Sequence, residues 1–186
     1  MNIKGSVFTT TKANIIEAFG EERWNSFMDK LAQKDNYFEN IILAISFIPL
    51  DKIIVFFDAL ISEFFNNDKN SYMMFGMAGA KYALKSGGLY HSFLLTKDLK
   101  QFVEIGLPQL WATYYDGGAV TAHLENNVAY VKVIGFPIKH VYFEKLIMGY
   151  FKQALKVFGK KSVATIVRSL TAGNDDICYK YELQDF

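Results

Sequence analysis

The sequence is poor in cysteine, histidine and proline, and neither charge is in excess. It has one cysteine, three histidines and three prolines among 186 residues. Cys178 alone cannot form an intramolecular disulfide, and it falls far short of the ligand set of a structural zinc site. The net charge is only +1, so the basic excess typical of nucleic-acid-binding domains is missing. We therefore expect a reduced cytoplasmic protein without a nucleic-acid partner.

The sequence also lacks a long uninterrupted hydrophobic run. Its most apolar stretch, residues 41–65, contains Pro49 and several charged residues. A membrane span needs about 20 largely uncharged apolar residues. The first six residues lack the apolar core of a signal peptide. These observations predict a cytoplasmic protein without a membrane span.

No catalytic motif is recognisable. The chain has no Gly-rich phosphate-binding loop, no nucleophile elbow and no HExxH zinc motif. His91, His123 and His140 lie far apart in the sequence, without the spacing of metal ligands. Asp175 and Asp176 are expected to be solvated turn residues. The sequence therefore favours a protein that is not an enzyme and holds no metal.

Aromatic residues, in contrast, make up 16% of the chain, and the first two thirds of the sequence have a helical hydrophobic period. Threonines 9–11 supply N-cap hydroxyls for the first helix, which ends at Phe19. Gly106 and Pro108 are expected to break or kink the last helix of this part. The further predicted helices cover residues 21–32, 36–44, 50–66, 72–85 and 97–115.

The last third alternates between apolar and polar residues, as β-strands do. Residues 120–124 and 128–134 flank Asn126 and Asn127, which tolerate the positive φ of a two-residue turn. In that hairpin, residues whose numbers sum to 253 face each other. Val120 and Val133 then lie on an apolar face, and His123 and Tyr130 lie on the opposite face. A slip by one residue would destroy this pattern.

A long amphipathic helix over residues 137–158 and a second hairpin complete the sequence. The second hairpin pairs residues 162–170 with 177–183 and places Arg168 opposite Tyr179, where its guanidinium stacks on the ring or reaches an anionic group. The fold class is α+β, with an N-terminal helical layer packed on a four-stranded antiparallel sheet. We expect one domain over 1–186, mainly helical over 1–117 and ββαββ over 118–186.

Residues 72–80 combine methionines with small residues, which suits either a helix crossing or the wall of an apolar pocket. Tyrosines and tryptophans near the helix–sheet junction suit a pocket with one wet end, and they suit core packing equally. The hypothesis is that this junction binds a small molecule. The predicted ligand-binding residues are Met73, Met77, Tyr90, Phe93, Trp111 and Tyr115.

Several short motifs, in this order, resemble an uncharacterised ligand-binding-like domain family that is abundant in myxobacteria. They are Lys4–Val7, Phe47–Leu50, Leu110–Gly118, Gly135–Pro137 and Ala172–Leu183. More distantly, the layout is similar to the superfamily of four-vinyl-reductase-type domains, TRAPP-complex Bet subunits and haem nitric-oxide/oxygen binding domains. That resemblance implies an apolar cavity between helices and sheet, ligand binding or sensing, sometimes dimerisation, and usually no catalysis.

The same resemblance bears on haem. Haem-binding members carry their axial histidine on a helix before the sheet, whereas residues 97–115 contain no histidine and the nearest one upstream is His91. Their propionate-binding motif would fall near Tyr130, Lys132 and Ile134, where only the tyrosine matches. We therefore expect no cofactor, with haem disfavoured.

The leading hypothesis is a sensing domain that binds a small apolar or amphipathic molecule and signals through a partner protein or a second copy of itself. A haem-based gas sensor with His91 near the iron is one alternative. A structural protein–protein interaction module, with its aromatic residues in a core or dimer interface, is the other.

Overall fold

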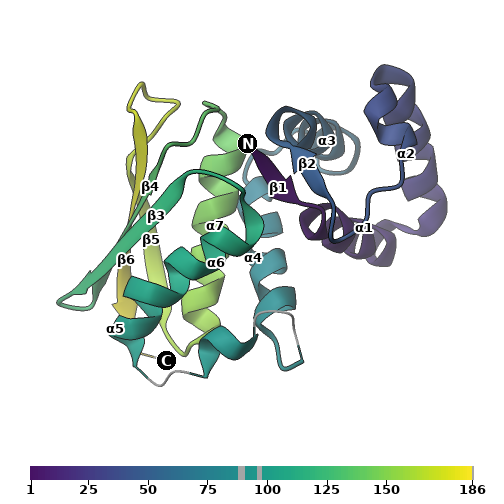
Figure 1. Cartoon of the computed structure of the whole chain (residues 1–186). Coiled ribbons are helices and arrows are strands. Elements are labelled where there is room, and N and C mark those ends of the chain that lie inside the picture. The colour runs from purple at the N-terminus through teal and green to yellow at the C-terminus, as the bar shows by residue number, and fades with distance from the viewer. Residues whose placement is uncertain (88–90, 96–97, 186) are drawn as a thin grey trace. The chain divides into compact units, whose positions relative to one another are not determined.

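The computed structural model describes residues 1–87, 91–95 and 98–185, and it has the predicted α+β fold (Figure 1). The chain forms two compact units, residues 1–71 and 72–186, each of which is described by itself. In the part of the chain that is described, no helix is long and apolar enough to cross a membrane.

The first unit packs helices around aromatic side chains. Its helices are α1 (Ser6–Phe19), α2 (Glu21–Lys34), the 3-10 helix η1 (Asn36–Glu39) and α3 (Leu50–Phe64). The rings of Phe8, Trp24, Phe27 and Phe56 form its centre, with neighbouring centroids 4.8–6.2 Å apart. Edge-to-face arrangements of this kind add to the free energy gained by burying the rings.

A short antiparallel pair of strands, β1 (Asn2–Lys4) and β2 (Phe47–Pro49), was not predicted. It also changes the start of α1, which begins at Ser6 and not after the threonines. Gly5 precedes α1 because a Cβ there would lie 2.1 Å from the carbonyl oxygen of Leu43. The hydroxyl of Thr11 donates within α1, to the carbonyl of Val7, instead of capping the helix.

The predicted helix over 36–44 is wrong beyond its first turn, because only η1 forms. Asp35 caps η1 by accepting a hydrogen bond from the backbone N–H of Tyr37, at 3.1 Å. The chain then turns at Leu43 and Ser46 to deliver β2 to β1. Pairing with residues far away in the sequence thus overrides the local helical preference.

The second unit contains the four-stranded antiparallel sheet, with strand order β3-β4-β6-β5. Its strands are β3 (Ala119–Glu125), β4 (Val128–Ile134), β5 (Lys161–Arg168) and β6 (Asp176–Gln184). Its helices are α4 (Ser71–Leu84), η2 (His91–Leu94), α5 (Leu99–Gln101), η3 (Phe102–Gly106), α6 (Leu107–Tyr114) and α7 (Val141–Val157).

The register predicted for the first hairpin is confirmed. Val120 pairs with Val133 and His123 pairs with Tyr130. Asn126 and Asn127 form the turn with φ of 49° and 61°. On the inner face of the sheet, Tyr179 and Tyr181 reach α7, where their hydroxyls donate to backbone carbonyls.

The second hairpin differs from its prediction by a bulge. The register shifts between Ile166 and Arg168, so Arg168 lies opposite Cys178 and not opposite Tyr179. A β-bulge inserts one residue into one strand and leaves it unpaired. The turn is closed by a hydrogen bond from the backbone N–H of Ser169 to the side chain of Asn174, at 3.1 Å.

The interruption predicted at Gly106 and Pro108 takes the form of a π-helical turn that ends at Gly106. The segments α5, η3 and α6 follow one another without a gap in the chain. The middle segment, η3, is a π-helix, in which the carbonyl of Phe102 accepts a hydrogen bond from the N–H of Leu107. A π-helical turn is wider than an α-helical one. Proline clashes with the carbonyl four residues earlier, and Pro108 follows directly on this wider turn, as the second residue of α6.

Candidate functional site

Aromatic side chains from α6 and from the segment before α7 form a buried cluster in the second unit. Trp111 and Tyr115 stack with centroids 4.0 Å apart and planes 19° apart, and Phe136 meets both rings edge-on. Phe143 of α7 packs on Phe136 at 4.6 Å. The indole N–H of Trp111 donates to the carbonyl of Gly117 at 3.1 Å, so this buried donor is satisfied.

The hydroxyl of Tyr115 differs from those of Tyr179 and Tyr181. It is buried, and it has no hydrogen-bond partner in the described ranges. Burial, and secondarily the neighbouring Tyr114, raises the pKa of Tyr115 far above its ordinary value. The phenol is therefore neutral at physiological pH and can donate a hydrogen bond to a guest.

Two further tyrosines near this cluster are satisfied by α7. The hydroxyl of Tyr179 donates to the carbonyl of Glu144 at 2.8 Å, and that of Tyr181 donates to the carbonyl of Met148 at 3.2 Å. Burial is the main reason that the pKa values of both phenols are raised. The Tyr115 phenolate would raise the pKa of Tyr179 further, so these two hydroxyls are electrostatic neighbours.

The methionines predicted to bind ligand lie on α4. A Cβ on Gly149 of α7 would stand 2.1 Å from the carbonyl oxygen of Met73 and 3.0 Å from its Cγ. Met73 therefore packs at a close crossing of α4 and α7, and Met77 is half-buried one turn further along. The structure brings Trp111 of α6 together with Tyr115, the residue that follows this helix. That these four side chains bind a ligand stays a prediction.

Tyr90 and the side chain of Phe93 lie outside the described residues, so their predicted role is not addressed. The backbone of Phe93 belongs to η2.

The histidines differ in which ring nitrogen donates a hydrogen bond and which accepts one. His91 Nδ1 lies 3.2 Å from the carbonyl oxygen of Leu84, which only accepts, so in the neutral ring Nδ1 carries the proton and Nε2 has a lone pair. His140 has the reverse arrangement, because its Nδ1 accepts from the N–H of Tyr142 to cap α7. His123 stacks on Tyr130, 4.9 Å between centroids.

The hydrogen bonds of the three histidines show which of them could bind the iron of a cofactor. A histidine that binds metal through Nε2 commonly donates its Nδ1 proton to a backbone carbonyl. His91 is half-buried and has that arrangement. Helix segment 99–114 has no histidine, and its Phe102 is fully buried against Phe158, with stacked rings 4.7 Å apart. The chain thus offers an axial ligand at His91 and none on that segment.

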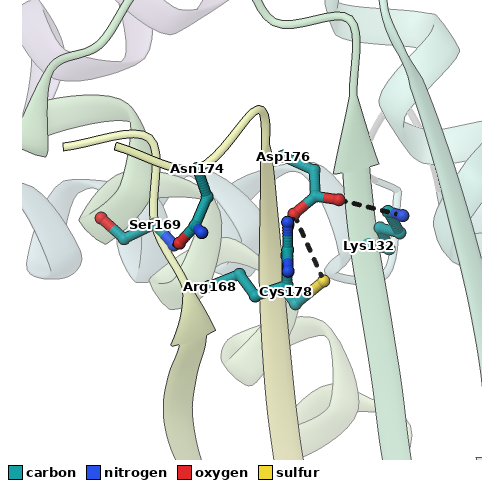
Figure 2. Close-up of polar contacts among 6 residues, drawn as sticks. All are labelled: Lys132, Arg168, Ser169, Asn174, Asp176 and Cys178. Atoms are coloured by element: carbon teal, nitrogen blue, oxygen red, sulfur yellow. Dashed lines mark hydrogen bonds and ion pairs between the residues drawn. The ribbon is translucent and has the colours of Figure 1, made fainter. Parts of the chain in front are cut away.

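A polar network on the other face of the sheet was missed by sequence analysis. Asp176 is the first residue of β6, and its carboxylate accepts from Arg168 Nε at 2.5 Å and from Lys132 Nζ at 2.9 Å (Figure 2). The bond from Arg168, and then that from Lys132, holds the pKa of Asp176 below its ordinary value. The expectation that Asp176 is a solvated turn residue is wrong, since its side chain is only 12% exposed.

Cys178 of β6 pairs with Lys132 of β4 on one side and with Arg168 of β5 on the other. Figure 2 shows the Cys178 thiol beside the Asp176 carboxylate, at 3.9 Å. Burial, and then the charge of Asp176, raises the pKa of this thiol. The bulge that brings Arg168 beside Lys132 could not be derived from the sequence.

No family model matches this sequence, and none of the curated proteins matches it. Solved structures do resemble the fold. An H-NOX domain variant from Shewanella oneidensis in the Fe(II)CO ligation state has a TM-score of 0.74 and 17% identity, over 98% of this chain and 99% of its own. An H-NOX protein from S. oneidensis in the Fe(II)NO state has a TM-score of 0.71, 15% identity and the same two coverages.

An oxygen-binding H-NOX domain related to soluble guanylate cyclases has a TM-score of 0.67 and 12% identity, over 98% of this chain and 95% of its own. Likenesses at these identities show the fold alone, which this chain shares with the H-NOX domains; nothing further supports the myxobacterial family. The expectation that the chain has no cofactor, with haem disfavoured, is wrong: its structural neighbours are iron-containing haem domains.

Proposed function

We propose that this chain is a haem-based gas-sensing domain. The observation that carries the proposal is its likeness to H-NOX structures over 98% of its length, in ligation states that include Fe(II)NO, Fe(II)CO and an oxygen complex. This places the gas-sensor alternative ahead of the hypothesis that the main ligand is an apolar or amphipathic molecule.

His91 is the residue proposed to hold the iron. Its Nδ1–H is directed to the carbonyl of Leu84, which orients the ring and leaves Nε2 to bind metal. A haem iron held by His91 would supply the chemistry that binds a diatomic gas. The carbonyl at the end of α4 thus determines which tautomer of His91 is present, and with it the basicity of the ligand.

The apolar cluster around Trp111 is proposed as a further part of the binding site. Trp111 and Tyr115 are each less than a tenth exposed, so together they exclude water. The unpartnered Tyr115 hydroxyl is a neutral donor that is suited to a polar group of a bound ligand. We propose Met73, Met77, Trp111 and Tyr115 as its apolar surroundings.

The domain would act by binding and signalling, without catalysis. Its output would be a changed contact with a partner protein or with a second copy of the chain.

Absorption spectroscopy tests the proposal. We expect the purified chain, titrated with haemin under reducing conditions, to develop a Soret band that shifts when CO is added. His91→Ala should lose or shift this band, while the matched variant His123→Ala should keep it, because His123 lies on the outer face of the sheet. A spectrum equal to that of free haemin, or identical spectra for His91→Ala and the wild type, would contradict the assignment.

A second candidate ligand is a small apolar or amphipathic molecule, favoured by the buried Tyr115 hydroxyl beside the aromatic cluster. Native mass spectrometry of gently purified protein measures it directly. A co-purifying lipid-sized mass that Tyr115→Phe diminishes supports this candidate, and a bare chain mass excludes it.

A further inference from the structure

The outer face of the sheet, opposite α7, carries a second polar site that the proposed sensing function does not use. A hollow of about 300 Å³ opens on this face. That volume is at the lower end of the range for small-molecule sites. Its lining includes His123, Tyr130, Lys132, Val167, Arg168 and Cys178.

One wall of the hollow is positively charged. Lys132 and Arg168 share the single carboxylate of Asp176, so these three side chains together carry one positive charge, and Asp175 acts on Arg168 only at longer range, without an ion pair between them. Both cations are about half exposed, at 48% and 49%. Within the described residues, Arg168 is hydrogen-bonded to Asp176 alone and through Nε alone. The terminal N–H groups of its planar fork therefore remain for a second anion.

The other wall is flat and aromatic. His123 and Tyr130 stack with their planes 16° apart and their centroids 4.9 Å apart. His123 of β3 pairs with Tyr130 of β4. Tyr130 is two residues before Lys132 on the same strand, so both side chains lie on the same face of the sheet. Val167 adds an aliphatic side chain that is 60% exposed. A flat ring can pack against such a surface while an attached anion reaches the cations.

We propose that this hollow binds a small aromatic carboxylate. The carboxylate accepts from the terminal N–H groups of Arg168 and from Lys132, because two oxygens match the guanidinium fork. The ring lies against His123 and Tyr130. The sharing of Asp176 between both cations holds their side chains in place before the ligand arrives, which lowers the entropic cost of binding.

Cys178 provides a built-in reporter, because it is the only cysteine of the chain and lines the hollow. The experiment measures the rate at which iodoacetamide alkylates the whole chain, by mass spectrometry, with benzoate as the probe. We expect saturating benzoate to slow alkylation at least fivefold. Inorganic phosphate should require higher concentrations, since it lacks the ring, and benzylamine should not protect.

Variants separate this site from general ionic effects. Arg168→Gln should raise the benzoate concentration for half-protection about tenfold, which corresponds to about 1.4 kcal/mol. Lys180→Gln is the matched control: Lys180 is on β6, bonded to Glu182 and outside the lining, and its loss should change half-protection less than twofold. Circular dichroism verifies that both variants are folded.

The proposal is overturned if benzoate leaves the alkylation rate unchanged, if benzylamine protects equally, or if the two variants shift half-protection alike. Should Cys178 not react with iodoacetamide, the ring-proton NMR shifts of His123 during the benzoate titration provide the same readout. Each of these outcomes is independent of haem binding, because His91 is not part of the hollow.

Discussion

At the residue scale, the tyrosines of the second unit show how hydrogen bonding divides chemically identical side chains. Tyr115 and Tyr179 are both less than a tenth exposed, yet Tyr179 donates to a backbone carbonyl and Tyr115 finds no partner in the described part of the chain. A buried hydroxyl without a partner costs about 1–3 kcal/mol, whereas a formed hydrogen bond contributes about 1 kcal/mol.

Removing each hydroxyl should therefore have a different effect. Tyr115→Phe is expected to leave the free energy of unfolding unchanged or to raise it by up to about 1 kcal/mol, because it removes an unsatisfied group. Tyr179→Phe should lower it by about 1 kcal/mol, because it breaks the bond to Glu144. Urea unfolding without added ligand measures both. A larger loss for Tyr115→Phe than for Tyr179→Phe would show that the Tyr115 hydroxyl is satisfied.

At the element scale, the crossing of α4 and α7 depends on two glycines that let the backbones meet. A Cβ on Gly76 would stand 2.0 Å from the carbonyl oxygen of Leu146, and one on Gly149 would stand 2.1 Å from that of Met73. Neither obstacle is a flexible side-chain end, so the helices would have to separate. The crossing holds Met73 and orients the helix on which Tyr179 and Tyr181 are anchored.

Gly149→Ala is expected to destabilise the chain by about 2 kcal/mol or more, since a methyl group inserted into a packed contact strains its neighbours. Gly79→Ala is the matched control on α4. A Cβ at Gly79 would meet nothing closer than 4.0 Å, so this variant should gain about 0.5–1 kcal/mol from helix propensity. Thermal unfolding of the two proteins checks the comparison, and equal melting temperatures would refute the close crossing.

At the scale of the whole molecule, each unit carries an aspartate that is stabilised in its charged form. The hydrogen bond from Lys52 is the main reason that the pKa of Asp35 is lowered in the first unit. Arg168 and Lys132 lower that of Asp176 in the second. Both aspartates have a lower pKa in the folded state than in the unfolded state, so their ionised forms stabilise the fold. This stabilisation is fully present above the unfolded pKa of about 3.9, and it is lost as the pH falls through the folded pKa.

Stability should therefore fall on acidification below about pH 4. Asp35→Asn combined with Asp176→Asn should be less stable than the wild type at neutral pH, and its stability should fall less between pH 5 and pH 2. Urea titrations across this range measure the slopes, and Glu17→Gln combined with Asp29→Asn, both exposed, accounts for the loss of two negative charges. A double variant with the wild-type slope would rule out these two aspartates as the cause.

The sequence by itself determined what depends on local pattern: most of the helical spans, with residues 36–44 as the exception, the first-hairpin register from Val120/Val133 to His123/Tyr130, and the α+β order of elements. Turn preference and hydrophobic period act between residues close in the chain, so one sequence suffices to read them. Of the predicted site, the sequence offered the residues Trp111 and Tyr115, and the stacking of their rings is a finding of the structure.

Tertiary structure alone decided the features that join distant residues. The pairing of β1 with β2, the bulge that brings Arg168 to Asp176, and the glycine crossing of α4 and α7 all depend on what the fold places opposite a residue. The ring nitrogen left free on His91 is decided in the same way, by the carbonyl of Leu84 at the end of α4. A hydrogen bond or a steric limit acts over a few ångströms, and chain folding, not residue type, determines which groups come that close.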